Sequence, residues 1–309
     1  MRILITGGAG FIGSWTAELA VAHHQVLVVD DLSTGSSQQV PPGARLVCVD
    51  VRDRELLRVV SSFRPHGVIH LAAQVSAPAS EQDPGEDASV NILGTINVLE
   101  ACRKANVRCF VYASSAAVYG EPQRLPVEED HPRQPRSPYG FSKLAGEWYC
   151  WRLTQRWGMN CVILRYANVY GPRQGVKGEG GVVAAFASRL ARGLPGRLEG
   201  DGEQTRDFVY VQDVARANIM ALQAPAGTYN IGGGRETSIR ALHAIMAAMA
   251  GVVDRPERAD PRPADIRRSV LCCRAAQERM GWRAEVTLED GLRRTMDYWQ
   301  ARTAHDRRV

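Results

Sequence analysis

The chain has 309 residues, of which 45% are hydrophobic and 23% are charged. This composition excludes a disordered protein and is sufficient for a large buried core in one or two domains. The formal net charge of +5 is small and spread along the chain. A few arginines that bind an anionic substrate would account for this excess as well as a nucleic-acid surface would. We expect no nucleic-acid partner.

Seven cysteines are present, and neither a C-x-x-C motif nor a Cys/His metal spacing occurs among them. We interpret them as small core residues in a reducing compartment, and we expect no bound metal. The sequence shows no apolar run of about 18 residues and no signal peptide. We therefore expect a soluble cytoplasmic protein that does not associate with membranes.

The first 170 residues alternate short runs rich in Val, Ile and Leu with helical patterns. The predicted strands are Arg2–Thr6, Gln25–Asp30, Arg45–Asp50, Gly67–Leu71, Cys109–Ser114 and Cys161–Tyr166. The predicted helices lie near Gly13–Ala22, Arg54–Ser61, Ala88–Lys104 and Tyr139–Trp157. Strands that are apolar on both faces and alternate with helices predict an α/β fold with a Rossmann-like, doubly wound parallel sheet.

The pattern changes after Tyr170. A glycine-rich loop is followed by predicted helices near Val182–Arg192 and Val209–Leu222, a strand at Thr228–Ile231 and an exposed loop at Asp254–Asp265. We expect a first domain of residues 1–170, to which residues 207–232 return. Residues 171–309 are expected to form a smaller, interleaved substrate lobe.

The first predicted strand runs directly into GGAGFIG (residues 7–13) and a helix. Glycines at this spacing allow a tight turn and let backbone N–H groups at the helix N-terminus approach a pyrophosphate. The second strand ends in Asp30-Asp31, acids that can bind the adenosine ribose and repel a 2′-phosphate. The combination predicts that the first domain binds NAD rather than NADP, although Asp30 alone could simply cap a strand. Asp50 could contact adenine or only form a turn.

A group of polar side chains is predicted at the carboxyl ends of the strands, where open α/β sheets bind ligands. Ser115 follows the fifth strand, and Tyr139 and Lys143 share one face of the next helix. An ammonium beside a phenol lowers the phenol pKa from about 10, and the phenolate can then remove a proton from a substrate hydroxyl. On its own, the Y-x-x-x-K spacing is weak evidence for a catalytic pair. It becomes strong evidence when it follows a dinucleotide-binding turn and a strand that ends in serine.

Nine segments share motifs with one known family: ITGGAGFIG (5–13), VVDDLSTG (28–35), HLAAQ (70–74), NILGT (91–95), SSAAVYGE (114–121), SPYGFSK (137–143), LRYANVYGPRQ (164–174), GDGEQTRDFVYVQDVA (200–215) and NIGGG (230–234). The chain resembles the extended short-chain dehydrogenase/reductases, in the NAD-dependent epimerase/dehydratase group. Within that group it is similar to the UDP-glucose (UDP-galactose) 4-epimerases. The resemblance covers nearly the whole chain.

The resemblance implies a role for each matching position. Ser115, Tyr139 and Lys143 match the catalytic positions, with Tyr139 as the base. Cofactor-contacting positions are Gly7, Gly10, Phe11, Ile12, Gly13, Asp30, Asp31, Asp50, Val51, Leu71, Ala72, Ala73, Gln74, Asn91, Tyr139, Lys143 and Tyr166. Positions that hold the nucleotide sugar are Ser115, Asn168, Val183, Arg206, Arg262, Asp265 and Ser269. Arginine forks suit a diphosphate, although Arg206 and Arg262 could equally form surface salt bridges.

The implied reaction is the interconversion of a UDP-hexose and its C4 epimer through a 4-keto sugar, with tightly bound NAD. Sugar dehydratases of the family carry an acid pair where this chain has Ala116 and Ala117, so an elimination is not expected. UDP-glucuronate 4-epimerases usually carry Thr at Asn168 and Arg at Gly175, which favours a neutral hexose here.

Two further positions bear on the substrate. Ser269 stands where some relatives have a Tyr that narrows the sugar pocket, so N-acetylated sugars are expected to fit. Glu199 stands where relatives usually place an aromatic or apolar residue near the uracil, and a carboxylate cannot stack on a base.

Two alternatives remain open: a nucleotide-sugar oxidoreductase that releases NADH, or an epimerase of another nucleotide sugar such as UDP-glucuronate. A non-catalytic NAD sensor is disfavoured because Tyr139 and Lys143 are both present. The resemblance also implies a homodimer formed by the helices near Ala88–Lys104 and Tyr139–Trp157.

Overall fold

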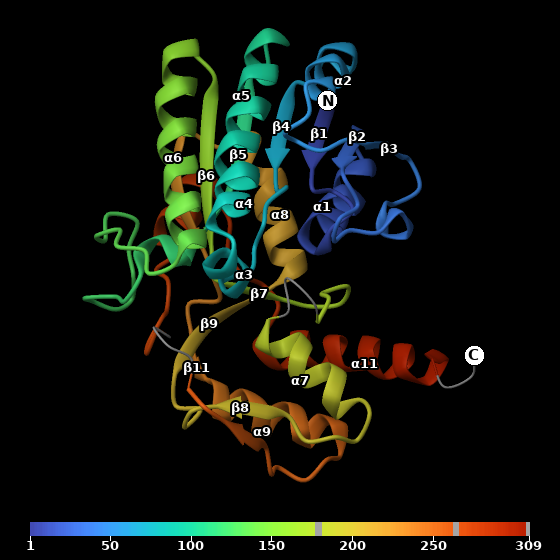
Figure 1. The fold of residues 1–309 in the computed structure, drawn as a ribbon, viewed down its shortest axis with the longest axis vertical. Helices are drawn as coiled ribbons and strands as arrows, with labels where there is room; N and C mark the ends of the chain where they lie inside the picture. The colour runs from blue at the N-terminus through green and yellow to red at the C-terminus, as the bar shows by residue number, and fades with distance from the viewer. Residues whose placement is uncertain (177–180, 262–265, 307–309) are drawn as a thin grey trace.

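The computed structural model describes residues 1–176, 181–261 and 266–306 (Figure 1). Its main element is a seven-stranded parallel sheet in the order β10-β6-β5-β4-β1-β2-β3. The strands are β1 (Arg2–Thr6), β2 (Gln25–Asp30), β3 (Ala44–Cys48), β4 (Gly67–His70), β5 (Cys109–Ser115), β6 (Asn160–Tyr166) and β10 (Gly227–Ile231). The predicted Rossmann-like, doubly wound sheet is confirmed.

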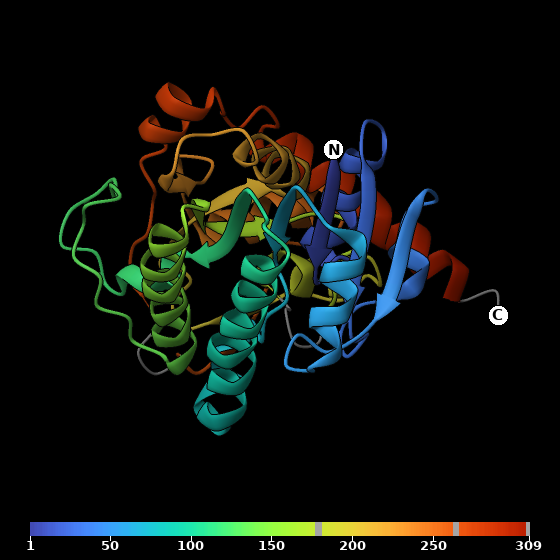
Figure 2. The same ribbon diagram turned by 90° about the horizontal axis from the view of Figure 1, so that it is seen from above.

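Helices cover both faces of this sheet because successive side chains of each strand point to opposite sides. Ile3 and Ile5 pack with α1 (Phe11–Val21) and α8 (Val211–Ala221), while Leu4 packs on the other face. That second face carries α2 (Glu55–Phe63), α5 (Thr95–Lys104) and α6 (Pro138–Trp157). Figure 2 looks down on the sheet with α5 and α6 on one side.

Short helical segments follow three of the strands. After β4 come α3 (Ala77–Gln82), α4 (Pro84–Ala88) and a π-helical turn, η2 (Ser89–Gly94), which continues into α5. The 3-10 segments η1 (Ser37–Gln39) and η3 (Ala116–Tyr119) follow β2 and β5. The predicted helix at 88–104 therefore begins with a wider turn, which changes the direction of its first side chains.

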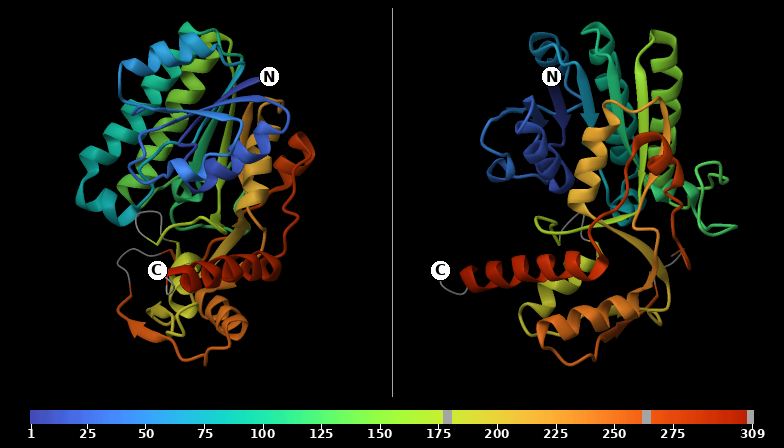
Figure 3. Two further views of the ribbon diagram at one scale, coloured as in Figure 1. Left: turned by 90° about the vertical axis from the view of Figure 1, so that its right-hand side faces the viewer. Right: turned by 180° about the vertical axis from the view of Figure 1, so that it is seen from behind.

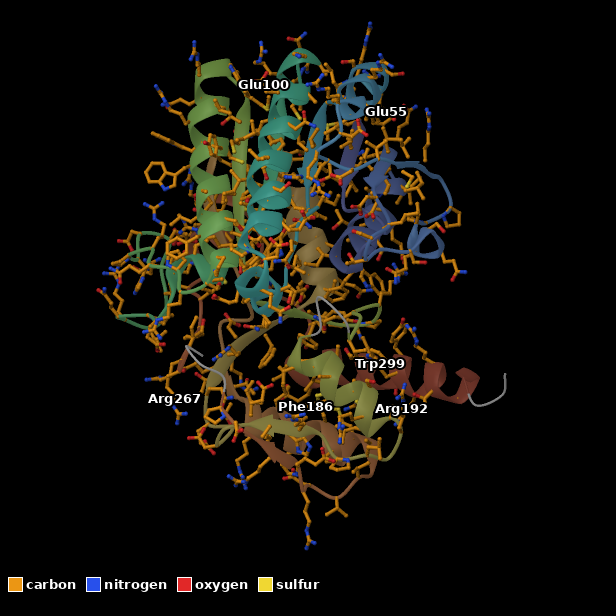
Figure 4. All side chains as sticks on the ribbon, in the orientation of Figure 1. Glu55, Glu100, Phe186, Arg192, Arg267 and Trp299 are labelled. Carbon is orange, nitrogen blue, oxygen red and sulfur yellow. The ribbon has the colours of Figure 1, made fainter. Side chains whose placement is uncertain are left out.

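The second lobe is built from short strands and three longer helices (Figure 3). One sheet contains β7 (Asn168–Tyr170), β9 (Thr205–Tyr210) and β11 (Glu236–Ser238), and another pairs β8 (Arg197–Glu199) with β12 (Glu257–Ala259). The helices are α7 (Val182–Leu190), α9 (Ile239–Ala250) and α11 (Leu288–Asp306), with the shorter α10 (Arg274–Met280) lying beside β10. Phe186 and Trp299 belong to the apolar core between them (Figure 4).

Two predicted elements in the second half of the chain differ from the structure. The helix predicted at 209–222 begins only at Val211, because Val209 and Tyr210 are the buried end of β9. The loop predicted at 254–265 contains β12, which pairs in parallel with β8; its last four residues lie outside the described part. Among the described residues, no helix is long and apolar enough to cross a membrane.

Candidate active site

The turn between β1 and α1 requires glycine because of close backbone contacts. Gly7 has a φ of +68°, and a Cβ there would lie 2.6 Å from the Ala72 backbone N. A Cβ on Gly13 would lie 2.0 Å from the Gly7 carbonyl oxygen. Gly10 is the N-cap of α1 and offers no side chain to cap it. The backbone N–H groups in the first turn of α1, which contains Phe11 and Ile12, therefore have no side-chain cap and can bind an anion.

Asp30 lies at the end of β2, beside this turn. Its carboxylate accepts hydrogen bonds from the backbone N–H groups of Ala9 and Leu32, each at 2.9 Å. Burial raises the pKa of this carboxyl, and the two N–H donors oppose that effect. Asp31 is exposed and accepts hydrogen bonds from the backbone and side chain of Ser33. One acid is fixed in the turn, and the other points to solvent at the cleft edge.

A cleft along the carboxyl edge of the sheet brings together most of the expected cofactor positions. It is lined by Gly7, Gly10, Asp30, Asp31, Asp50, Val51, Leu71, Ala72, Ala73 and Gln74, with Arg52, Glu86 and neighbouring residues. Sequence reasoning missed Arg52 and Glu86. The Arg52 guanidinium binds Asp50 at 2.6 Å and Glu86 at 2.9 Å, so it bridges the β3–α2 loop and α4 across the cleft wall.

Asn91 connects this cleft to the catalytic helix. Its amide oxygen accepts a hydrogen bond from the Gln74 backbone N at 2.8 Å. Its amide nitrogen donates to the Gln74 carbonyl, to Asp87 and to the Ser142 hydroxyl. The π-helical turn places Asn91 between Gln74 on the cleft wall and Ser142 on α6, and Asn91 is 1% exposed. Its side chain is therefore fully used in positioning these two segments.

Tyr139 lies in the first turn of α6, which begins where the sequence predicts. The Ser137 hydroxyl caps the helix, with Pro138 in its first turn. The Tyr139 backbone N donates to the Ser80 hydroxyl of α3 at 3.0 Å. The ring of Tyr139 is half-buried. The start of the helix, where Tyr139 lies, is therefore held by a second element.

Lys143 is buried one turn further along α6. Its Nζ donates to the Ala113 carbonyl at 3.0 Å and lies 5.3 Å from the Tyr112 ring centroid. Burial lowers the Lys143 pKa to about 8, and the nearby Asp87 opposes that effect. At neutral pH the Lys143 amine is therefore mostly protonated, and its positive charge can stabilise a negative charge nearby.

Ser114 and Ser115 at the end of β5 have different partners. The Ser115 hydroxyl accepts a hydrogen bond from the Ala117 backbone N at 3.1 Å, and Ser115 pairs with Tyr166 across the sheet. Ser114 donates to Glu147 of α6 at 2.5 Å. Ser115 is half-buried at the open edge of the sheet, whereas Ser114 is 2% exposed and committed to an internal contact.

A buried ion pair supports these residues and was missed by sequence reasoning. The Arg165 guanidinium binds both Glu147 carboxylate oxygens, at 2.8 and 2.7 Å, and also contacts the Tyr119 hydroxyl. The pair joins β6 to α6 across 18 residues of sequence, which no local motif reveals. Tyr166, also on β6, donates its hydroxyl to Asn218 of α8, and burial raises its pKa well above the usual value.

The expected substrate positions other than Ser115, which ends β5, lie in the second lobe or at its boundary with the first domain. Asn168 is exposed on β7, which pairs with β9. Arg206 on β9 donates to the Thr205 and Ile266 carbonyls, at 2.7 and 2.6 Å. Val183 is 1% exposed in the apolar core of this lobe rather than in a cleft. Ser269 is half-buried. Arg262 and Asp265 lie outside the described residues.

Glu199 lies at the end of β8, beside a second cleft. That cleft is lined by Glu199, Gly200, Asp201, Gln204, Pro261, Ile266 and Arg267. Because Arg206 donates to Ile266, this cleft adjoins the arginine expected to hold the diphosphate. Among the described residues, no group of three or more His, Cys, Asp or Glu side chains is placed to hold a metal.

Comparison with known proteins identifies the family. A family model described as NAD dependent epimerase/dehydratase family matches residues 3–232. The chain belongs to this family. Its glycine turn, buried strand-end acid and Tyr139–Lys143 helix fit an NAD-dependent member. A Cβ at Gly7 or Gly13 would collide with neighbouring backbone atoms, so glycine is needed for the tight turn that would let the backbone approach a pyrophosphate.

Relatives within the family match the chain over nearly its full length. The UDP-glucose 4-epimerase of Mycolicibacterium smegmatis is 41% identical and covers 97% of this chain and 99% of the relative. The UDP-glucose 4-epimerase of Thermotoga maritima, solved with UDP-glucose, is 40% identical with a TM-score of 0.96, covering 98% and 100%. That of Thermus thermophilus, solved with NAD, is 45% identical with a TM-score of 0.92, covering 97% and 99%.

Proposed function

We propose that this protein is an NAD-dependent UDP-hexose 4-epimerase that interconverts UDP-glucose and UDP-galactose. The observation that carries the proposal is the full-length match, at 40–45% identity, to 4-epimerases solved with UDP-glucose or NAD. The placement of Ser115, Tyr139 and Lys143 at the same sheet edge as the cleft supports it.

The side chains suggest how the reaction proceeds. Tyr139 takes the proton of the sugar 4-hydroxyl, and Ser115 hydrogen-bonds the same oxygen. Lys143 stabilises the phenolate through its buried ammonium. NAD, when bound, supplies the chemistry of accepting the C4 hydride and returning it. After the 4-keto sugar has turned its opposite face to the cofactor, Tyr139 returns its proton to the C4 oxygen, so the protein ends the cycle unchanged.

We assign one part of the chain to NAD binding and another to nucleotide-sugar binding. Residues 1–170 and 207–232 are assigned to the NAD-binding domain and the rest of residues 171–309 to the nucleotide-sugar lobe. At the boundary, β7 and the end of β9 pair within the sheet of the second lobe. The pairing of β10 with β6 and the packing of α8 on α1 support this division. Asn168, Arg206 and the segment ending in Ser269 hold the nucleotide sugar. A serine at position 269 also leaves room for N-acetylated hexoses.

An apolar surface on the α5 and α6 side supports a homodimer. Its members are exposed: Leu93, Phe141, Trp148, Tyr149 and Trp151. The rings of Trp148 and Trp151 are more than half exposed and pack edge to face, with centroids 6.1 Å apart. Contiguous exposed aromatics on one helix are typical of a protein interface. We also propose a cytoplasmic location, since all seven cysteines are free.

Proton NMR of the purified protein with UDP-glucose tests the activity. With no cofactor added, we expect the galacto epimer to form, and UDP-N-acetylglucosamine to be converted in the same way. Accumulation of NADH only after NAD is added would instead identify an oxidoreductase. Turnover of UDP-glucuronate alone would identify an epimerase of a different sugar.

A further inference from the structure

One loop of the second lobe crosses to the first helix of the NAD-binding domain. Residues 171–174 follow β7, and the Trp15 indole N–H donates to the Pro172 carbonyl at 3.0 Å. The Arg173 guanidinium lies 4.0 Å from the Trp15 ring centroid, binds the Glu18 carboxylate at 2.5 Å and donates to the Ser14 hydroxyl at 3.3 Å. Four contacts from two loop residues thus converge on the first two turns of α1.

The backbone at Arg173 indicates that these contacts determine the loop conformation. Arg173 has a φ of +75°, in the left-handed region that non-glycine residues rarely adopt. Such a conformation costs about 1 kcal/mol or more and persists only where surrounding contacts fix it. An arginine rather than a glycine stands there, and its side chain makes three of the four contacts to α1.

The contacts of this loop with α1 begin one helical turn after the phosphate-binding turn in the chain. The Ser14 backbone N donates to the Gly10 carbonyl, and the Ser36 backbone N donates to the Ala9 carbonyl. The loop before Ser36 lines the NAD cleft, while Ser36 itself lines an outer groove together with Glu18 and Arg173. A movement of the second lobe away from α1 would therefore break the Arg173 contacts and remove the support that they give to the helix whose N-terminus adjoins the phosphate-binding turn.

We infer that Trp15 and Arg173 form a clasp between the two lobes that retains NAD from one turnover to the next. Both are positioning residues that act through α1. The inference rests on the proposed epimerase function, because an epimerase regenerates NAD in every cycle and gains from slow release. An enzyme that exported NADH would instead gain from fast release of the cofactor.

NAD release from the purified holoenzyme is the direct test. Arg173→Met keeps a flexible chain against the Trp15 ring and removes the charge. The matched control is Arg103→Met: Arg103 lies 5.5 Å from the Trp157 ring centroid and pairs with Glu100 at 2.9 Å, away from the cleft. The rate of NAD dissociation is followed after dilution into a competing NAD-binding enzyme. Epimerisation is assayed with and without added NAD.

We expect Arg173→Met to release NAD about tenfold faster than wild type, the change typical of losing one charge-assisted hydrogen bond. Its turnover should fall without added NAD and recover when NAD is supplied. Trp15→Phe, which loses only the indole N–H contact, should show a smaller increase, and Arg103→Met none. NAD release within twofold of wild type in both clasp variants would overturn the inference. That result leaves the proposed function intact, since wild-type turnover tests it separately.

Discussion

His70 is a buried histidine beneath the NAD cleft and makes a specific prediction about stability. Its Nδ1 lies 2.7 Å from the Thr6 hydroxyl, and its Nε2 lies 3.0 Å from the Thr95 hydroxyl. Thr95 donates its own proton to the Asn91 carbonyl, so it accepts from His70. This arrangement fits a neutral imidazole protonated on Nε2. Burial, and secondarily the charge of Lys143, lower the His70 pKa to about 3.

The size of the change in the free energy of unfolding follows from proton linkage. In the unfolded chain His70 titrates near 6.5, whereas in the folded protein it stays neutral at pH 7.5 and at pH 5.5. Its contribution to stability is therefore present above pH 6.5 and is lost as the pH falls toward 3, because only the unfolded state gains the proton. At pH 5.5 the unfolded state is favoured by RT ln 11, or about 1.4 kcal/mol, relative to high pH.

Urea unfolding at pH 7.5 and pH 5.5, with NAD at one fixed concentration, measures this difference. His70→Asn should be less stable than wild type at pH 7.5 because one hydrogen bond is lost. Its further loss between the two pH values should be smaller than that of wild type by about 1.4 kcal/mol. His23→Asn, at an exposed position, is the control and should follow wild type. An equal pH-dependent loss in His70→Asn and wild type would refute the reasoning.

Other substitutions probe the catalytic helix. Tyr139→Phe should slow epimerisation by about 10²–10⁴-fold, as for loss of a general base. HPLC should find NAD still bound, and its loss would argue against a purely chemical role. Gly146→Ala would place a Cβ 2.0 Å from the Tyr112 hydroxyl oxygen and should destabilise the fold by about 1–3 kcal/mol; an unchanged urea midpoint would contradict this packing. The double change Phe141→Ser with Trp148→Ser should give a monomer in sedimentation velocity, and a persisting dimer would place the interface elsewhere.

The first domain could be predicted from sequence because its signals are local. The strands of the main sheet within residues 1–170 contain short apolar runs, and the glycine turn after β1 is contiguous in the chain. Tyr139 and Lys143 are four residues apart on one helix, so their shared face follows from helical geometry alone. The ends of parallel strands meet at one edge, which brings Ser115 near them without any tertiary information.

The second lobe could not be predicted in the same detail. Its strands β7, β8, β11 and β12 are three residues long, too short for an alternating pattern to appear. Strand β12 follows a Pro- and Arg-containing stretch and exists only because β8 pairs with it. Side-chain contacts between segments far apart in the sequence could not be predicted either, as in the pairs Arg165–Glu147 and Arg173–Glu18.

Helix α6 shows how one element can serve the site and the interface at once. Tyr139, Lys143 and Glu147 recur every four residues and face the end of β5, where Lys143 and Glu147 bind Ala113 and Ser114. The exposed side chains of Phe141 and Trp148 lie on the opposite side by helical spacing. No side chain belongs to both faces of the helix, so one face can be changed without altering the other. A monomer made by changing the outer face should therefore keep its turnover, and a loss of turnover would mean that dimerisation holds the catalytic face in place.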